Sequence, residues 1–414
     1  MRVMVLGAGL LGVTSAYYLQ QLGHEVTVVD RHAQPAANAL GREAAFSDSA
    51  QAATQTLMQA ARERAPMRAS LARCLGALPA WWARRIEAGA GHDPGVLMED
   101  FWRFSRHTVQ ALKQESAVPS PRPGRRLLQF YTDRRAFEAT AARQPRLQAM
   151  GSERQLLSAG DAMRIEPMLQ ALSGRVAGAT LSQDDFSGDA SAFAAELVFL
   201  CRAAGVRFLA RHTVVALRRT RGRVSHVEAV DAQGEHVALD ADAFVLALGP
   251  ASMRHARDVD VKLPLRFVRE YSLGIPTLPG APMPRHALQR AGRGGCSLHA
   301  AGTADAPAVA LRSSSTIDLA GPLTPHPARF LALRDHAKLL MPGQLDTCRA
   351  RLDSRVLVQS ANGLPLIGRT PLPNLFLNTA PGRLGWVHAC GAGKSIAHIV
   401  TGLRPEAAFA FTGL

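Results

Sequence analysis

Residues 1–32 read MRVMVLGAGLLGVTSAYYLQQLGHEVTVVDRH, and two interpretations compete for this stretch. A basic residue followed by an apolar run and small residues is typical of a signal peptide. The same letters are also typical of the first strand, glycine turn and helix of a dinucleotide-binding fold. The choice between them decides the compartment, the cofactor and much of the function.

The pattern beyond residue 12 favours the dinucleotide-binding interpretation. Val3–Leu6 predicts a short strand that leads directly into the glycine turn. Residues 13–22 predict a helix that continues past any cleavage point, and residues 25–30 predict a second strand that ends on Asp30. We therefore predict a dinucleotide site here rather than a signal peptide.

The spacing of the glycines has a physical reason. Gly7 permits the tight turn after the strand, Gly9 lets the backbone approach a pyrophosphate, and Gly12 lets the helix pack closely on the strand. The N–H groups at the positive end of that helix then face the phosphates. Asp30 ends the second strand, where a carboxylate can accept hydrogen bonds from both ribose hydroxyls.

Composition narrows the function classes. The formal net charge is +15, and Lys occurs at only four positions, so Arg carries nearly all of the basic charge. Two explanations fit the high Arg content equally well. One is compositional bias, and the other is a basic surface that attracts anionic substrates or a membrane. No zinc-finger spacing, RNP-type aromatic pattern or compact basic helix is present, so we do not expect nucleic-acid binding.

The five cysteines point to the cytoplasm. The cysteines are odd in number and far apart, without the spacing of a zinc site, a redox dithiol or a disulfide scaffold. We expect a cytoplasmic protein. Its positive charge could also attract it to the anionic inner face of the cytoplasmic membrane, as a peripheral protein. We expect no bound metal.

The order of the predicted elements indicates an α/β fold of two domains. Strands and helices alternate at both ends of the chain, and a strand-rich region covers residues 263–323. We predict a Rossmann-like dinucleotide-binding domain from residues 1–48, 150–255 and 350–414. Residues 49–149 and 256–349 are predicted to form a second domain, with a mixed β-sheet and flanking helices that hold the substrate.

Several stretches resemble the small-subunit family of D-amino-acid dehydrogenase, within the wider D-amino-acid oxidase-like superfamily of flavoproteins. They are VLGAGLLGVTSAYYLQQLGHEVTVVDR (5–31), DDFSGDASAFAAEL (184–197), DAFVLALGP (242–250), REYSLGIP (269–276) and NLFLNTAPGRLGWVHACGAGKSIAHIVTGLRP (374–405). The resemblance implies an FAD enzyme that oxidises the α-carbon of a D-amino acid, or a similar small amine acid, to an imino acid. The imino acid would give a 2-oxo acid and ammonia, and the electrons would pass to a quinone-type acceptor.

The resemblance also assigns residues to the cofactor. Those at the pyrophosphate and ribose are Leu6, Gly7, Ala8, Gly9, Leu10, Leu11, Gly12 and Asp30. Arg31, Val214 and Gly249 are expected along the cofactor. Gly382, Leu384, Gly385 and Trp386 are expected to close over the flavin ring.

Tyr271, Arg312 and Arg355 are the candidates for holding the substrate carboxylate, since Arg offers a bidentate fork to that group. Leu357 stands where the resembling family has an Arg that can clamp the carboxylate, and Asn362 stands where it has an Asp. Ala380 and Pro381 replace a Gly-His pair. A catalytically weak or non-catalytic FAD-binding subunit is therefore an alternative. An NAD-dependent dehydrogenase is another, because it uses the same glycine fingerprint.

Overall fold

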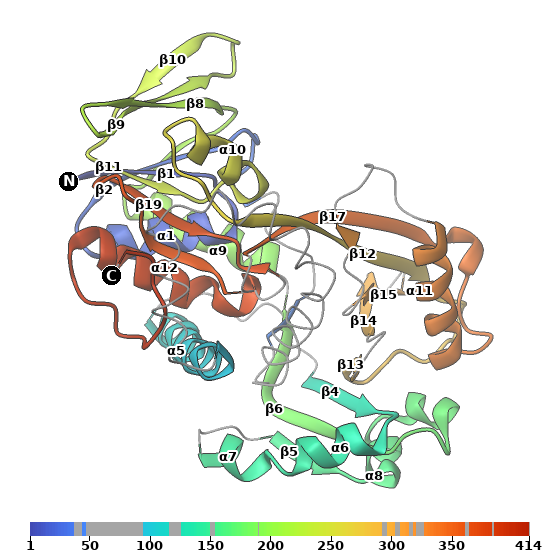
Figure 1. Cartoon of the computed structure of the whole chain (residues 1–414). Helices are drawn as coiled ribbons and strands as arrows, with labels where there is room; N and C mark the ends of the chain where they lie inside the picture. Colours follow the sequence, from blue (N-terminus) through green and yellow to red (C-terminus); the bar gives the residue numbers. More distant parts are fainter. Residues whose placement is uncertain are drawn as a thin grey trace, which may run out of the picture.

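The computed structural model describes residues 1–36, 44–46, 94–115, 126–149, 154–188, 190–291, 296–302, 307–313, 318–319, 327–360, 364–382 and 385–413. These residues form a six-stranded, a three-stranded and a ten-stranded sheet (Figure 1). Residues 49–89, the first part of the predicted second domain, lie outside them. No helix in these ranges combines the length and hydropathy that a membrane span needs.

The six-stranded sheet contains the N-terminal strand at an inner position. Its strands, in spatial order, are β18 (Leu366–Arg369), β19 (Leu375–Thr379), β11 (Ala243–Leu246), β1 (Arg2–Leu6), β2 (Glu25–Val29) and β7 (Arg207–Leu209). Every neighbouring pair is parallel except β18 with β19. Because β1 is paired on both sides, it is an integral part of the folded domain.

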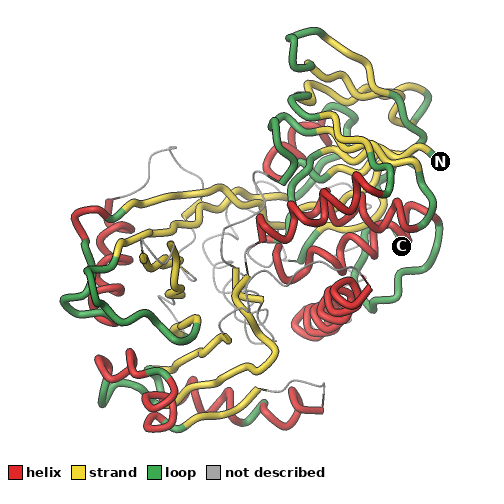
Figure 2. Tube along the Cα trace, turned by 180° about the vertical axis from the view of Figure 1, so that it is seen from behind, coloured by secondary structure: helices red, strands yellow, loops and turns green. Residues whose placement is uncertain are grey.

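Two different layers cover the faces of this sheet, and alternate residues of β1 contact them. Val3 and Val5 belong to a buried cluster with four helices, whereas Met4 and Leu6 belong to a second cluster with the three-stranded sheet. The helices are α1 (Leu10–Gln21), α5 (Pro94–Glu115), α9 (Ala190–Ala203) and α12 (Gly385–Thr401). The other layer contains β8 (Thr213–Thr220), β9 (Arg223–Val230), β10 (His236–Leu239), the 3-10 helix η2 (Gly249–Ala251) and α10 (Ser252–Arg257). The view from behind shows the same arrangement (Figure 2).

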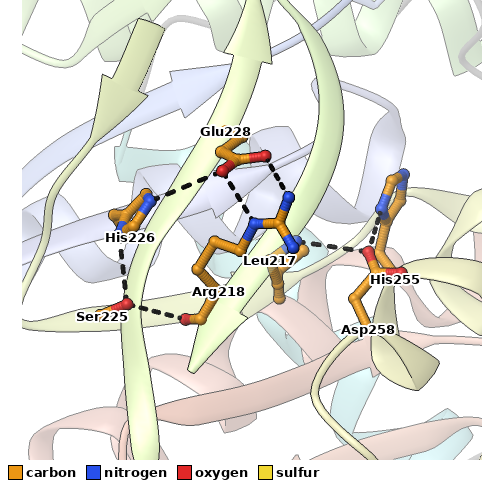
Figure 3. A network of polar contacts seen from close by, with 7 residues as sticks. All are labelled: Leu217, Arg218, Ser225, His226, Glu228, His255 and Asp258. Carbon is orange, nitrogen blue, oxygen red and sulfur yellow. Dashed lines mark hydrogen bonds and ion pairs between the residues drawn. The ribbon is translucent and has the colours of Figure 1, made fainter. Parts of the chain in front are cut away.

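A polar network ties α10 to the three-stranded sheet (Figure 3). Asp258 Oδ2 accepts hydrogen bonds from the Leu217 N–H (3.3 Å) and from Nδ1 of the buried His255 (3.0 Å). Arg218, which follows Leu217 on β8, forms two hydrogen bonds of 2.8 Å with Glu228 on β9. The network holds α10, and with it the turn that follows β11, against the sheet.

The ten-stranded sheet forms the second domain. Eight strands follow the order β16 (Asp318–Leu319), β12 (Leu265–Pro276), β15 (Pro307–Ser313), β14 (Cys296–Gly302), β13 (Ala287–Arg290), β4 (Arg126–Tyr131), β6 (Gly178–Gly188) and β3 (Ala44–Phe46). In addition, β17 (Arg351–Ser360) pairs with β12, and β5 (Arg154–Leu157) pairs with β6. The long strands β12, β17 and β6 lead from the first domain into the second (Figure 1).

Helices cover both faces of this sheet. One face carries the buried core with α8 (Ala159–Ile165), η1 (Pro167–Leu172) and α11 (Pro327–Leu340), and the short 3-10 helix η3 (Thr347–Arg349) precedes β17. The opposite face, at β4, β5 and β6, is covered by α6 (Arg134–Ala141) and α7 (Gln144–Ala149). There the Phe137 ring lies 5.6 Å from the Tyr131 ring and against Gly178.

The sheets divide the chain differently from the expected domain boundaries. Residues 154–188 and 351–360 were expected in the dinucleotide-binding domain, but they pair within the ten-stranded sheet. The helix α5 was expected in the second domain, but it packs on α12 in the first. The physical reason is that strand partners and helix packing come from residues distant in sequence, which local patterns do not reveal. The predicted strand, turn, helix and strand of residues 3–30 all agree with the structure.

Candidate active site

The turn between β1 and α1 is closely packed. Gly7 has φ +105°, and a Cβ there would lie 2.5 Å from the Ala247 carbonyl oxygen. A Cβ on Gly12 would overlap the Gly7 carbonyl oxygen. Both glycines are therefore required by the close approach of backbone segments, as the spacing predicts.

Gly9 differs from its two neighbours, because its surroundings are open. No heavy atom of the described chain lies within 4 Å of where its Cβ would be. Gly9 is also the N-cap of α1, and no side chain caps the helix there. The N–H groups of the first helical turn thus face a space that a phosphate group can occupy, which fits a dinucleotide. Leu10 and Leu11 open that turn, with Leu10 packed in the core.

Asp30 lies directly after β2 and is tied to the same turn. Its Oδ2 accepts a hydrogen bond of 2.7 Å from the Ala8 N–H, and its Oδ1 accepts one of 2.8 Å from the His32 N–H. Each carboxylate oxygen keeps a lone pair for a further donor. The carboxylate is thus held in place at the carboxyl end of the parallel strands, where such sheets bind ligands.

Three further residues were predicted to lie along the cofactor. Gly249 has φ +56° and opens η2 shortly after β11. Ala247, the residue that follows β11, donates its N–H to the Leu6 carbonyl oxygen at 2.9 Å. Val214 is buried on β8, and Arg31 is exposed, with its Nε 3.1 Å from His32 Nε2.

The segment between β19 and α12 approaches from the C-terminal part of the chain. Ala380 and Gly382 both have positive φ values, +56° and +59°, and Ala380 is fully buried. Gly385 begins α12, and the Trp386 ring lies 5.0 Å from the Phe193 ring in an edge-on contact within the core. Leu384 lies outside the described residues.

The comparison with known families agrees with this geometry. The model of a family described as FAD dependent oxidoreductase matches residues 2–399. This chain belongs to that family. FAD is therefore its cofactor, which decides against the NAD alternative, and the enzyme is an oxidoreductase.

Sequence relatives and solved structures extend the similarity over the whole chain. The chain is 32% identical to D-amino acid dehydrogenase of Paramagnetospirillum magneticum, with 98% of this chain and 96% of the relative covered. It is 31% identical to D-amino acid dehydrogenase of Dechloromonas aromatica, with 99% of each covered. The fold is similar to glycine oxidase from Geobacillus kaustophilus (TM-score 0.70, 18% identity, 98% and 96% covered). It is also similar to L-proline dehydrogenase from P. horikoshii (TM-score 0.71, 13% identity, 97% and 93% covered).

In this FAD-dependent oxidoreductase, the candidate substrate residues occupy both faces of the second sheet. Tyr271 is 2% exposed and belongs to the core cluster with Leu273 on the same strand. Arg355 is the register partner of Glu270, and Arg312 that of Ser272. Since alternate residues of a strand lie on opposite faces, register positions 312 and 355 are on the same face as Glu270 and Ser272, opposite that of Tyr271.

Glu270 is a residue that the motif-based reasoning missed. It is 8% exposed, and it occupies a register position on the same face as the two arginines. The signal was present in the segment REYSLG, because the alternation that places Tyr271 on one face places its neighbours on the other. The sequence did not reveal which of the two faces is covered by α11.

Proposed function

We propose that this enzyme oxidises the α-carbon of a D-amino acid, or of a similar small amine acid, to an imino acid. Water then hydrolyses the imino acid to a 2-oxo acid and ammonia, and a quinone-type acceptor receives the electrons. The observation that carries the proposal is the 32% identity to a D-amino acid dehydrogenase over nearly the full length of both chains.

Bound FAD supplies the two-electron acceptor for this reaction. The protein's own part is to hold the pyrophosphate at the Gly9 end of α1, to hold the ribose at Asp30, and to fix the substrate carboxylate. A guanidinium group suits the last task, because its hydrogen bonds to a carboxylate are charge-assisted. Fixing the carboxylate orients the α-carbon, and such positioning lowers the barrier without a strong catalytic base.

Arg355 is the stronger candidate for this carboxylate clamp. Residues 355 and 357 lie on one face of β17, about 7 Å apart along the strand at ~3.3 Å per residue. Leu357 is buried and lies nearer to the first domain, since its register partner is Val268 near the start of β12. Arg355 is thus one step further along the same face from the position where the resembling family carries its Arg.

Anaerobic titration of the purified holoenzyme with a panel of D-amino acids tests the proposal. Loss of the oxidised-flavin absorbance with at least one D-amino acid, and not with its L-enantiomer, is the expected result. A flavin that stays oxidised with every candidate favours the second function, a non-catalytic FAD-binding subunit, which Leu357 in place of an Arg also favours. Product analysis for ammonia and 2-oxo acid then checks the complete reaction.

The acceptor needs a separate test. We propose a quinone, reached at an anionic membrane surface to which the net charge of +15 attracts the protein. Reduced enzyme mixed with a water-soluble quinone should be reoxidised much faster than by dissolved oxygen. Sedimentation with anionic vesicles at low salt, and release at high salt, should accompany this. Equal rates of reoxidation by quinone and by oxygen would argue against a quinone acceptor. A protein that does not bind anionic vesicles would argue against attraction to the membrane.

A further inference from the structure

A group of buried polar side chains lies in the second domain, on the face covered by α6 and α7. Arg154 on β5 is the register partner of Ser182 on β6, and Gln129 on β4 is the register partner of Thr180, two residues before Ser182. Alternation puts all four on the face opposite the core residues Leu128, Phe130, Ala179 and Leu181. Each of the four is at most 3% exposed.

Arg154 has no counter-ion in this group. Its Nε and Nη1 are buried and form no hydrogen bond with any part of the chain that the structure describes, and no acidic side chain there pairs with it. A buried charge without an opposite charge beside it is strongly destabilising, because burial removes its hydration without compensation. Buried water can satisfy the N–H groups but supplies no opposite charge.

Three neighbouring polar atoms are also unsatisfied: an amide N–H group, a hydroxyl and an amide oxygen. Gln129 Nε2, Ser182 Oγ and Gln144 Oε1 are buried without a hydrogen-bond partner in the described chain. Gln129 Oε1 is occupied, because it accepts from the Tyr131 hydroxyl at 3.1 Å. Gln144, at the start of α7, donates through Nε2 to the Arg154 carbonyl oxygen and so holds this helix over the group.

We propose that Arg154, Gln129 and Ser182 form a binding site for a small carboxylate. The guanidinium supplies the opposite charge, and the amide of Gln129 and the hydroxyl of Ser182 supply further donors to its oxygens. The unsatisfied Oε1 of Gln144 suits the hydroxyl or amino group of a substituted carboxylate. Binding brings together β4, β5, β6 and α7 and thereby stabilises the second domain.

This site is separate from the candidate substrate face. In the spatial order of the sheet, β15, β14, β13 and β4 lie between β12 and β6, and β5 lies beside β6. At ~4.8 Å per strand, β12 and β6 are about 24 Å apart. The proposal therefore stands independently of the reaction at the flavin.

Thermal unfolding of the holoenzyme in sodium formate, acetate or lactate, against sodium chloride at equal ionic strength, tests the site. A sodium phosphate series distinguishes a carboxylate site from a general oxyanion site. We expect carboxylates to raise Tm in a saturable way, to bind in calorimetry, and to leave the oxidised-flavin spectrum unchanged. Equal Tm values in chloride and carboxylate would overturn the proposal, and stabilisation by phosphate alone would overturn its carboxylate assignment.

The variant Arg154→Met removes the charge and should weaken carboxylate binding about tenfold or more. Arg134→Met is the matched control, because Arg134 is exposed on α6, pairs with Glu138, and should leave binding unchanged. If Arg154→Met does not fold, Gln129→Met gives the same test through the loss of one donor. Unchanged carboxylate affinity in the folded Arg154 or Gln129 variant would contradict the site.

Discussion

The Ala8 N–H donates a hydrogen bond of 2.7 Å to Asp30 Oδ2, which joins the glycine turn after β1 to the end of β2. A second backbone donor, the His32 N–H, holds the other carboxylate oxygen at 2.8 Å. The carboxylate is thus fixed by two backbone groups without any help from a ligand. Such preorganisation reduces the entropy that cofactor binding must otherwise lose.

Asp30→Asn should weaken FAD binding about tenfold or more, because it removes the charge of the carboxylate that we propose for the ribose hydroxyls. The dissociation constant of FAD from reconstituted apoprotein, followed by flavin fluorescence, measures the effect. Asp133→Asn is the control, since Asp133 also accepts two backbone N–H groups, at the N-terminus of α6 in the second domain. Equal loss of FAD in both variants would mean that Asp30 acts only through general stability.

Gly9→Ala and Gly12→Ala should separate cofactor binding from folding. Gly9 has φ −71° and open surroundings, so Ala fits the folded apoprotein but places a methyl group where the phosphate approaches. Gly12→Ala forces α1 away from the Gly7 carbonyl oxygen and should destabilise the fold by about 1–3 kcal/mol or more.

Urea unfolding of the apoproteins and FAD titration measure the two effects separately. We expect Gly9→Ala to keep its unfolding midpoint and to bind FAD weakly. A Gly9→Ala protein that binds FAD as tightly as the parent would argue against a phosphate at this turn.

The N-terminal unit was predictable from sequence because all of its determinants are local. Val3–Leu6, the three glycines and Asp30 act within thirty residues, and the structure forms the expected strand, turn, helix and strand from them. The second domain and its boundary were less predictable, since β6 depends on pairing with β4 and with β5, and since α5 packs against α12 of the first domain. The face of Tyr271 was also hidden, because alternation gives two faces but does not say which one α11 covers.

Arg355→Lys should raise the KM for the amino acid about 10–100-fold, because Lys keeps the charge but loses the planar fork of donors. Arg312→Lys should change KM less. Its register partner on β12 is Ser272, two residues beyond Glu270, which is the partner of Arg355. Tyr271→Phe should leave KM close to the parent value and act on stability, since Tyr271 belongs to the core. Steady-state kinetics with an artificial electron acceptor gives these values. A KM effect confined to Tyr271→Phe would place the substrate on the other face of the sheet.

His388 should make the enzyme less stable in mild acid. Burial lowers its pKa to about 3 from an ordinary 6.5, and burial followed by the charge of Arg290 lowers the pKa of His336 to about 4. Below pH 6.5 the unfolded chain binds protons that the folded chain does not. The free energy of unfolding should therefore fall by up to about 1.4 kcal/mol per pH unit for each histidine as pH falls from 6.5 towards the folded-state pKa.

Replacing His388 tests whether this histidine lowers the free energy of unfolding as pH falls. His388 lies on α12 with its ring 5.2 Å from the Phe101 ring, and neither ring nitrogen has a hydrogen-bond partner in the described chain. His388→Met should lose less stability than the parent between pH 6.5 and pH 4, whereas the exposed control His236→Asn should follow the parent. Urea unfolding at several pH values measures the difference. Parallel pH profiles for the parent and His388→Met would contradict a neutral, buried imidazole.

The most direct test of the central claim is anaerobic mixing of the FAD-loaded enzyme with paired D- and L-enantiomers of several amino acids. We predict one FAD per chain, rapid loss of the oxidised-flavin absorbance with a D-enantiomer, and release of ammonia and the matching 2-oxo acid. A protein that does not bind FAD would contradict the cofactor site, and bound FAD that no D-amino acid reduces would contradict the proposed reaction.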